Sequence, residues 1–153
     1  MTLYLVRHGS AGRRNNADPN DTERHLDDKG LRQAVAVADH LGVEPISRIL
    51  SSPLPRCVET VEPLAEVLGL EVVVERRLRE GTDLLGTWPL IEELAESKVV
   101  LCTHGDVIPE LVRANELRGM RIAGKAGFAK GSVWALEGWD GTRYAKGSWD
   151  KLR

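Results

Sequence analysis

Short apolar runs alternate with stretches of helical spacing along most of the chain. The first run, residues 3–6, is rich in strand-forming side chains and predicts a buried strand that ends near Arg7. Further runs predict strands over residues 48–51, 70–74 and 98–103, and one or two more at residues 132–136 and 143–145.

Apolar residues three and four positions apart predict helices between these strands. The first covers residues 31–41 and ends at Gly42. A Ser52-Pro53 cap is expected to begin the second, and Pro63 is expected to kink it or divide it into two. The other helices are predicted over residues 88–95 and 107–117. Residues 9–28 and 76–86 are polar and predict long loops, which often carry function.

This order of elements predicts an α/β fold, a three-layer sandwich with a mostly parallel central sheet and helices on both faces. The length of 153 residues fits a single domain, residues 1–153. Ligands of such sheets bind beyond the carboxyl ends of the strands. A functional site is therefore expected at that edge.

The overall charge of the chain is close to neutral, since 21 Lys and Arg stand against 23 Asp and Glu. This balance excludes a protein that holds a nucleic-acid polymer over its whole surface, and it provides no general attraction to anionic membranes. No apolar run approaches the length of a membrane span. The two cysteines, Cys57 and Cys102, lack metal-type spacing and favour the reducing cytoplasm. The composition carries no signal for oligomeric state.

Unusual side chains follow three of the predicted strands. The first strand ends in Arg-His-Gly at residues 7–9, the second leads to a helix start that carries Arg56, and the fourth ends in Thr-His-Gly at residues 103–105. Each motif alone has an ordinary interpretation as a turn or a helix cap. Because these strand ends share one edge of the sheet, two arginines and two histidines are expected to meet there.

Four segments together resemble the histidine phosphatase superfamily, which includes the cofactor-dependent phosphoglycerate mutases. They are Leu-Val-Arg-His-Gly at residues 5–9, Leu-Asp-Asp-Lys-Gly-Leu-Arg-Gln-Ala at 26–34, Ser-Ser-Pro-Leu-Pro-Arg-Cys-Val-Glu-Thr at 51–60 and Cys-Thr-His-Gly-Asp-Val-Ile at 102–108. The chain is most similar to the small, SixA-like branch. Residues 56–65 and 130–134 also resemble a phosphatase-type domain that is fused to Nudix hydrolases in some actinobacterial proteins.

The resemblance implies a covalent phosphohistidine intermediate on His8, with the neutral ring as the nucleophile. Arg7, Arg56 and a protonated His104 would surround the phosphoryl oxygens and stabilise their charge in the transition state without a metal ion. Glu80 stands where larger members carry a glutamate that acts as general acid, although the smallest members often lack it. A solvated loop carboxylate is the competing interpretation of Glu80.

The remaining candidates would bind substrate. Gly9 and Gly105 let the backbone approach a phosphate, and Ser10 offers a further hydrogen bond. The long loop after His8 supplies three arginines that either hold a second anionic group of the substrate or are simply solvated: Arg13, Arg14 and Arg24. No metal and no cofactor are expected.

Three functions stay open on this basis. The first is a metal-independent phosphatase that acts on a phosphorylated small molecule, a nucleotide or a phosphohistidine protein. A phosphoglycerate mutase ranks second, because the segment between Glu80 and His104 is short and leaves little to close over a substrate. The third is a non-catalytic phosphate-binding module. The short segment also predicts an open site that admits a bulky substrate.

Overall fold

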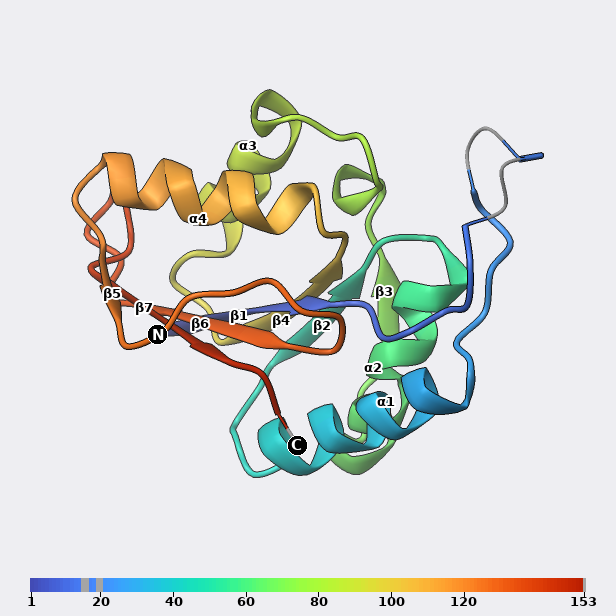
Figure 1. Cartoon of the computed structure of the whole chain (residues 1–153). Helices are drawn as coiled ribbons and strands as arrows, with labels where there is room; N and C mark the ends of the chain where they lie inside the picture. The colour runs from blue at the N-terminus through green and yellow to red at the C-terminus, as the bar shows by residue number, and fades with distance from the viewer. Residues whose placement is uncertain (15–16, 19–20, 153) are drawn as a thin grey trace.

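The computed structural model describes residues 1–14, 17–18 and 21–152. Its centre is a sheet of seven strands in the order β3-β2-β4-β1-β6-β7-β5 (Figure 1). The strands are β1 (Thr2–Arg7), β2 (Arg48–Ser51), β3 (Val72–Val74), β4 (Val99–Thr103), β5 (Arg121–Ala123), β6 (Val133–Glu137) and β7 (Lys146–Asp150).

Most of the strand pairs are parallel. Strand β1 pairs with β4, β4 with β2, β2 with β3, and β5 with β7 in parallel, whereas β6 is antiparallel to both β1 and β7. The expected mostly parallel sheet is therefore confirmed. The antiparallel strand β6 closes the edge of the parallel part on the side of β1.

Helices cover both faces of the sheet (Figure 1). They are α1 (Asp28–Leu41) and α2 (Pro55–Leu68) on one face, and α3 (Leu84–Leu94) and α4 (Val107–Leu117) on the other, with a short 3-10 helix η1 (Arg76–Leu78) before α3. Side chains of β1 alternate between the two cores: Leu3 and Leu5 join the α3–α4 side, and Tyr4 and Val6 join the α1–α2 side. This two-sided burial explains why the strand is apolar without interruption.

The start of α2 differs from the sequence prediction. Its first turn begins at Pro55, its cap residue is Leu54, and no side chain caps it. Ser52 is not the cap, because its hydroxyl contacts His104 instead. Pro63 does not divide the helix, which runs as one element to Leu68.

The third helix and the last third of the chain also differ. Helix α3 begins four positions before the predicted start because the Asp83 side chain accepts a hydrogen bond from the Gly86 N–H and caps it. The predicted strand at residues 143–145 is wrong: Tyr144 is buried there with its N–H donated to the Asn115 side chain, and the strand β7 starts at Lys146. Strand β5 was not predicted.

The carboxyl ends of β1, β2 and β4 lie next to one another at one edge of the sheet. Arg7, the last residue of β1, is opposite Thr103 of β4, and Ser51 at the end of β2 is opposite Cys102. Each of these strands continues directly into one of the three motifs that the sequence singled out. Among the described helices, none combines the length and the apolar character that a membrane crossing requires.

Candidate active site

A pocket of about 250 Å³ opens at the carboxyl ends of the three strands. It is lined by Arg7, His8, Gly12, Arg14, Arg24, Arg56, Glu80, Gly105, Asp106 and Lys130. Residues from the loop after β1, from α2, from the segment after η1 and from the loop before β6 thus converge on a space that holds a phosphoryl group together with part of its leaving group.

The ring of His8 is fixed at the base of this pocket. Its Nδ1 lies 2.8 Å from the Gly9 carbonyl oxygen, which only accepts hydrogen bonds, so Nδ1 carries the proton and Nε2 keeps its lone pair. The backbone holds this arrangement, since the His8 N–H donates to Thr103 O and the Gly9 N–H donates to Thr60 Oγ1. Burial, reinforced by the charges of Arg56 and Arg7, lowers the His8 pKa to about 4, against an opposing contribution from the Gly9 carbonyl. At neutral pH His8 is an uncharged ring.

His104 packs behind His8, with the two ring centroids 5.3 Å apart. Its Nε2 lies 2.8 Å from Ser52 Oγ and 3.5 Å from Cys57 Sγ. Burial, followed by the effects of His8 and the two arginines Arg56 and Arg7, lowers the His104 pKa to about 2. The expectation of a protonated His104 is therefore corrected for this structure: the ring is neutral at physiological pH because burial and the neighbouring cations outweigh the opposing effect of the Asp21 carboxylate.

Arg56 is almost completely buried in the first turn of α2, at 1% exposure. One end of its guanidinium, Nη1, donates to the Asp21 carbonyl oxygen at 2.6 Å, and Nη2 contacts Glu80 Oε2 at 3.2 Å. Among the residues that the structure describes, none accepts a hydrogen bond from the buried Nε of Arg56. The planar guanidinium is thus fixed at the pocket and keeps an unpaired N–H donor, which suits the binding of an oxyanion.

Arg7 forms the opposite wall. Its Nη1 donates to the Phe128 carbonyl oxygen at 2.7 Å, while its buried Nε also lacks a partner within the described ranges. Gly105 lies flat on the guanidinium: a Cβ at this position would stand 2.6 Å from the Arg7 Cζ. A side chain at residue 105 would displace Arg7, so this close approach requires glycine.

Glu80 reaches the pocket from the segment after η1. Its Oε2 contacts Arg56, and its Oε1 lies 3.1 Å from the Arg14 Nη1. Two carboxylates close to it in sequence are engaged elsewhere, because Glu75 pairs with Arg77 and Asp83 caps α3. The structure thus brings Glu80 beside the two arginines and not into bulk solvent.

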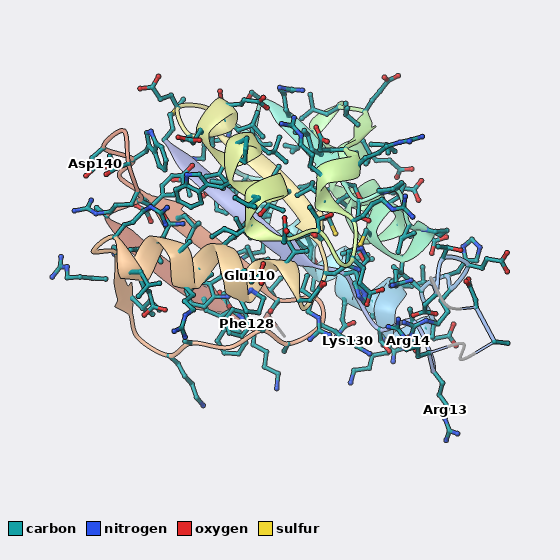
Figure 2. All side chains as sticks on the ribbon, turned by 90° about the horizontal axis from the view of Figure 1, so that it is seen from above. Arg13, Arg14, Glu110, Phe128, Lys130 and Asp140 are labelled. Atoms are coloured by element: carbon teal, nitrogen blue, oxygen red, sulfur yellow. The ribbon has the colours of Figure 1, made fainter. Side chains whose placement is uncertain are left out.

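The loop candidates divide into two groups. Arg14 and Arg24 line the pocket, whereas Arg13 is exposed and projects away from it (Figure 2). Ser10 is not brought into the pocket either, because its hydroxyl donates to Asp27 and its N–H donates to Gln33. Ser10 therefore links the loop to α1 and leaves no polar group for a substrate.

Sequence reasoning missed three residues of the pocket or its support. Asp21 is fully buried; its carboxylate accepts from the Arg24 Nε at 2.9 Å and lies 3.7 Å from the Arg56 Nη2. It was interpreted only as part of the long polar loop over residues 9–28, although its spacing of three from Arg24 is a signal for an ion pair. Asp106 and Lys130 were also missed as lining residues, though both lie within or directly after motifs that the sequence analysis quoted. Within the described ranges, no group of three or more His, Cys, Asp or Glu side chains is arranged to hold a metal ion.

Acidification is expected to destabilise the folded chain through His8. The folded-state pKa of about 4 lies below the ordinary value of 6.5, so the unfolded chain takes up the proton first as the pH falls. The stabilisation is complete above about pH 6.5 and is lost toward pH 4. Urea unfolding should show about 2 kcal/mol of loss from His8 between pH 7 and pH 5, beside a loss of the same sign from His104, whose pKa is lowered as well. His8→Asn should remove the His8 part of the loss and leave the His104 part. An equally steep loss in the variant would contradict the assignment.

Comparisons with known proteins agree on one family. Residues 3–89 match the histidine phosphatase superfamily (branch 1). The 8-oxo-(d)GTP phosphatase of Mycolicibacterium smegmatis is 34% identical over 145 residues, which cover 92% of this chain and 45% of that protein. A probable phosphoglycerate mutase, GpmB of Yersinia pestis (strain Pestoides F), is 34% identical over 127 residues, covering 76% of this chain and 58% of that protein. The chain spans about half the length of the curated relatives it matches.

Solved structures share the fold. The protein histidine phosphatase SixA complexed with tungstate aligns with a TM-score of 0.75 and 21% identity, covering 98% of this chain and 94% of that one. A mycobacterial glucosyl-3-phosphoglycerate phosphatase with inorganic phosphate aligns with a TM-score of 0.73 and 23% identity, covering 99% and 96%. At these identities the alignments show a common fold.

Proposed function

The chain belongs to the histidine phosphatase superfamily, and on that premise we propose that it is a metal-independent phosphatase that works through a phosphohistidine on His8. The proposed substrates are phosphomonoesters of small molecules or nucleotides, or a phosphohistidine protein, in the cytoplasm. The observation that carries the proposal is the neutral His8 ring, whose Nδ1 is fixed by the Gly9 carbonyl so that Nε2 is free beside two arginines. A phosphatase needs this combination of nucleophile and cations.

In the first step the Nε2 lone pair of His8 forms a bond to phosphorus, and the bond from phosphorus to the leaving oxygen breaks. Negative charge on the three equatorial oxygens is stabilised by Arg7 and Arg56, whose buried Nε groups have unused donors. Water then attacks the phosphohistidine, inorganic phosphate leaves, and the His8 lone pair is restored. The Nδ1–H bond to Gly9 keeps the ring oriented through both steps.

His104 would change its protonation state when a phosphoryl dianion arrives. The same burial that lowers its pKa next to the cations strengthens its attraction to an anion in the pocket. We therefore expect the ring to take up a proton on binding and to donate a hydrogen bond, with Ser52 holding its Nε2. This reconciles the neutral ring of the structure with the cationic role expected from the family.

Glu80 is proposed as the general acid that protonates the leaving oxygen and later assists the attacking water. Glu80→Gln is expected to lower kcat about 10²–10⁴-fold for an alkyl phosphate, whose leaving group needs a proton, and less than about tenfold for p-nitrophenyl phosphate, whose leaving group does not. The two substrates are compared in steady-state assays. Glu110→Gln, on the exposed face of α4, is the matched control. Equal losses with both substrates would assign Glu80 a structural role instead.

The proposal is tested by phosphate release from p-nitrophenyl phosphate in the presence of a chelator. Turnover that continues without divalent metal supports it. Interconversion of 3- and 2-phosphoglycerate faster than phosphate release would favour a mutase, and phosphate binding without any turnover would favour a binding module.

A further inference from the structure

A second cavity, larger than the catalytic pocket, lies between α1 and the ends of two segments from the last part of the chain. Its volume is about 690 Å³, against about 250 Å³ for the catalytic pocket. It is lined by Lys29, Arg32, Gln33 and Ala36 of α1, by Ala129, Lys130 and Gly131 before β6, and by Lys151 and Leu152 after β7. A volume of this size matches the pockets that hold small organic ligands.

The cavity is joined to the catalytic pocket through two residues. Lys130 lines both spaces. Gln33 forms the wall between them, because its Nε2 donates to the Lys130 carbonyl oxygen at 3.0 Å and its Oε1 accepts from the Ser10 N–H at 2.7 Å. The Gly131 N–H in turn contacts the carbonyl oxygens of Arg7 and His8. A ligand in the cavity is therefore one side chain away from the segment that carries the proposed nucleophile.

The lining is basic and has no carboxylate. None of its four cations, Lys29, Arg32, Lys130 and Lys151, takes part in an ion pair in the part of the chain that the structure describes. The carboxylates nearby have other partners: Asp27 accepts from Ser10, Gly12 and Gly30, and Asp150 accepts from the Leu152 N–H. Four like charges around a hollow favour an anionic ligand.

We propose that this cavity binds a second phosphate group of the substrate together with its organic part, so that the preferred substrate is a small organic bisphosphate. The inference rests on the proposed phosphatase function, with the transferred phosphoryl group on His8 and the rest of the molecule passing Lys130. The apolar atoms of Ala36, Ala129 and Leu152 suit a ring or carbon chain between the two phosphates. A concave site of this volume favours a small molecule over the flat surface of a protein.

The test compares three probes: p-nitrophenyl phosphate, adenosine 5′-monophosphate and adenosine 3′,5′-bisphosphate. The wild-type chain should prefer the bisphosphate to the monophosphate by about tenfold or more in kcat/KM. In the double variant K29Q/R32Q, the KM for the bisphosphate should rise until this preference disappears, while kcat/KM for p-nitrophenyl phosphate stays within about twofold. The two nucleotides differ by one phosphate, so the comparison isolates the second anionic group.

Arg113→Gln, which removes one exposed cation from α4 on the other face of the sheet, is the control and should change neither ratio. Thermal unfolding of the variants verifies that they fold. Equal kcat/KM for the two nucleotides in the wild type, or a preference that survives in K29Q/R32Q, overturns the inference and leaves the phosphatase function intact. If no probe is hydrolysed, the proposed function itself fails.

Discussion

Replacing His8 with alanine is expected to lower kcat by at least about 10⁴-fold, the largest effect of any single substitution in this chain. The variant loses the Nε2 lone pair that attacks phosphorus, and the pocket offers no second group in the same position. His104 does not replace it, since its Nε2 is engaged by Ser52. Steady-state phosphate release and the thermal unfolding midpoint, measured together, separate loss of chemistry from loss of fold.

The matched control is His40→Ala, because His40 is half-exposed near the end of α1 and takes no part in the pocket. It should retain kcat within about twofold. The unfolding midpoint of His8→Ala verifies that the variant folds, since the substitution also removes the hydrogen bond from Nδ1 to the Gly9 carbonyl. Substantial turnover by His8→Ala would contradict covalent catalysis on this residue.

The second largest effect is expected at Arg56. Arg56→Lys should lower kcat about 10²–10³-fold, although the charge is kept, because an ammonium group cannot contact two phosphoryl oxygens in the plane of a guanidinium. Arg56→Ala should lower kcat further by no more than about tenfold. The Asp21 carbonyl and Glu80 would lose their partner in both variants, so a lower unfolding midpoint is expected as well.

Arg113→Lys, at an exposed position of α4, controls for the general effect of an Arg-to-Lys change. Kinetics with p-nitrophenyl phosphate, whose leaving group needs no acid, separate the loss of Arg56 from any displacement of Glu80. Full rescue of kcat by lysine would contradict a role that depends on the planar fork.

The sequence predicts the fold, and the edge of the sheet that carries the site, wherever the pattern depends on the immediate surroundings of a strand or helix. Strand β1 is apolar throughout because both of its faces are buried, and its end is marked by the change to Arg7 and His8. The last third of the chain was predicted less well. There Tyr144 is held by Asn115 from α4, a contact between residues 29 positions apart that no local pattern reveals.

The sequence predicts those residues of the candidate site that lie at or directly after the end of a strand, such as His8 and His104. Asp21 was missed because its contacts to Arg24 and Arg56 depend on how the long loop folds back over α2. Ser52 was interpreted as a helix cap, but in the fold its hydroxyl faces a histidine of a different strand end. A charge count from the sequence assigns every histidine its ordinary pKa. In the fold, burial and the neighbouring arginines lower the pKa of His8.

Trapping the phosphohistidine on His8 is a direct test of the proposed covalent mechanism. The wild-type chain is mixed with a ³²P-labelled substrate in the presence of a chelator, denatured within the first turnover under alkaline conditions, which preserve phosphohistidine, and digested for mass spectrometry. We expect one phosphoryl group on His8 that is released by acid, and no labelled peptide from His8→Ala. Turnover without any labelled protein, or a label on another residue, would contradict the proposed mechanism.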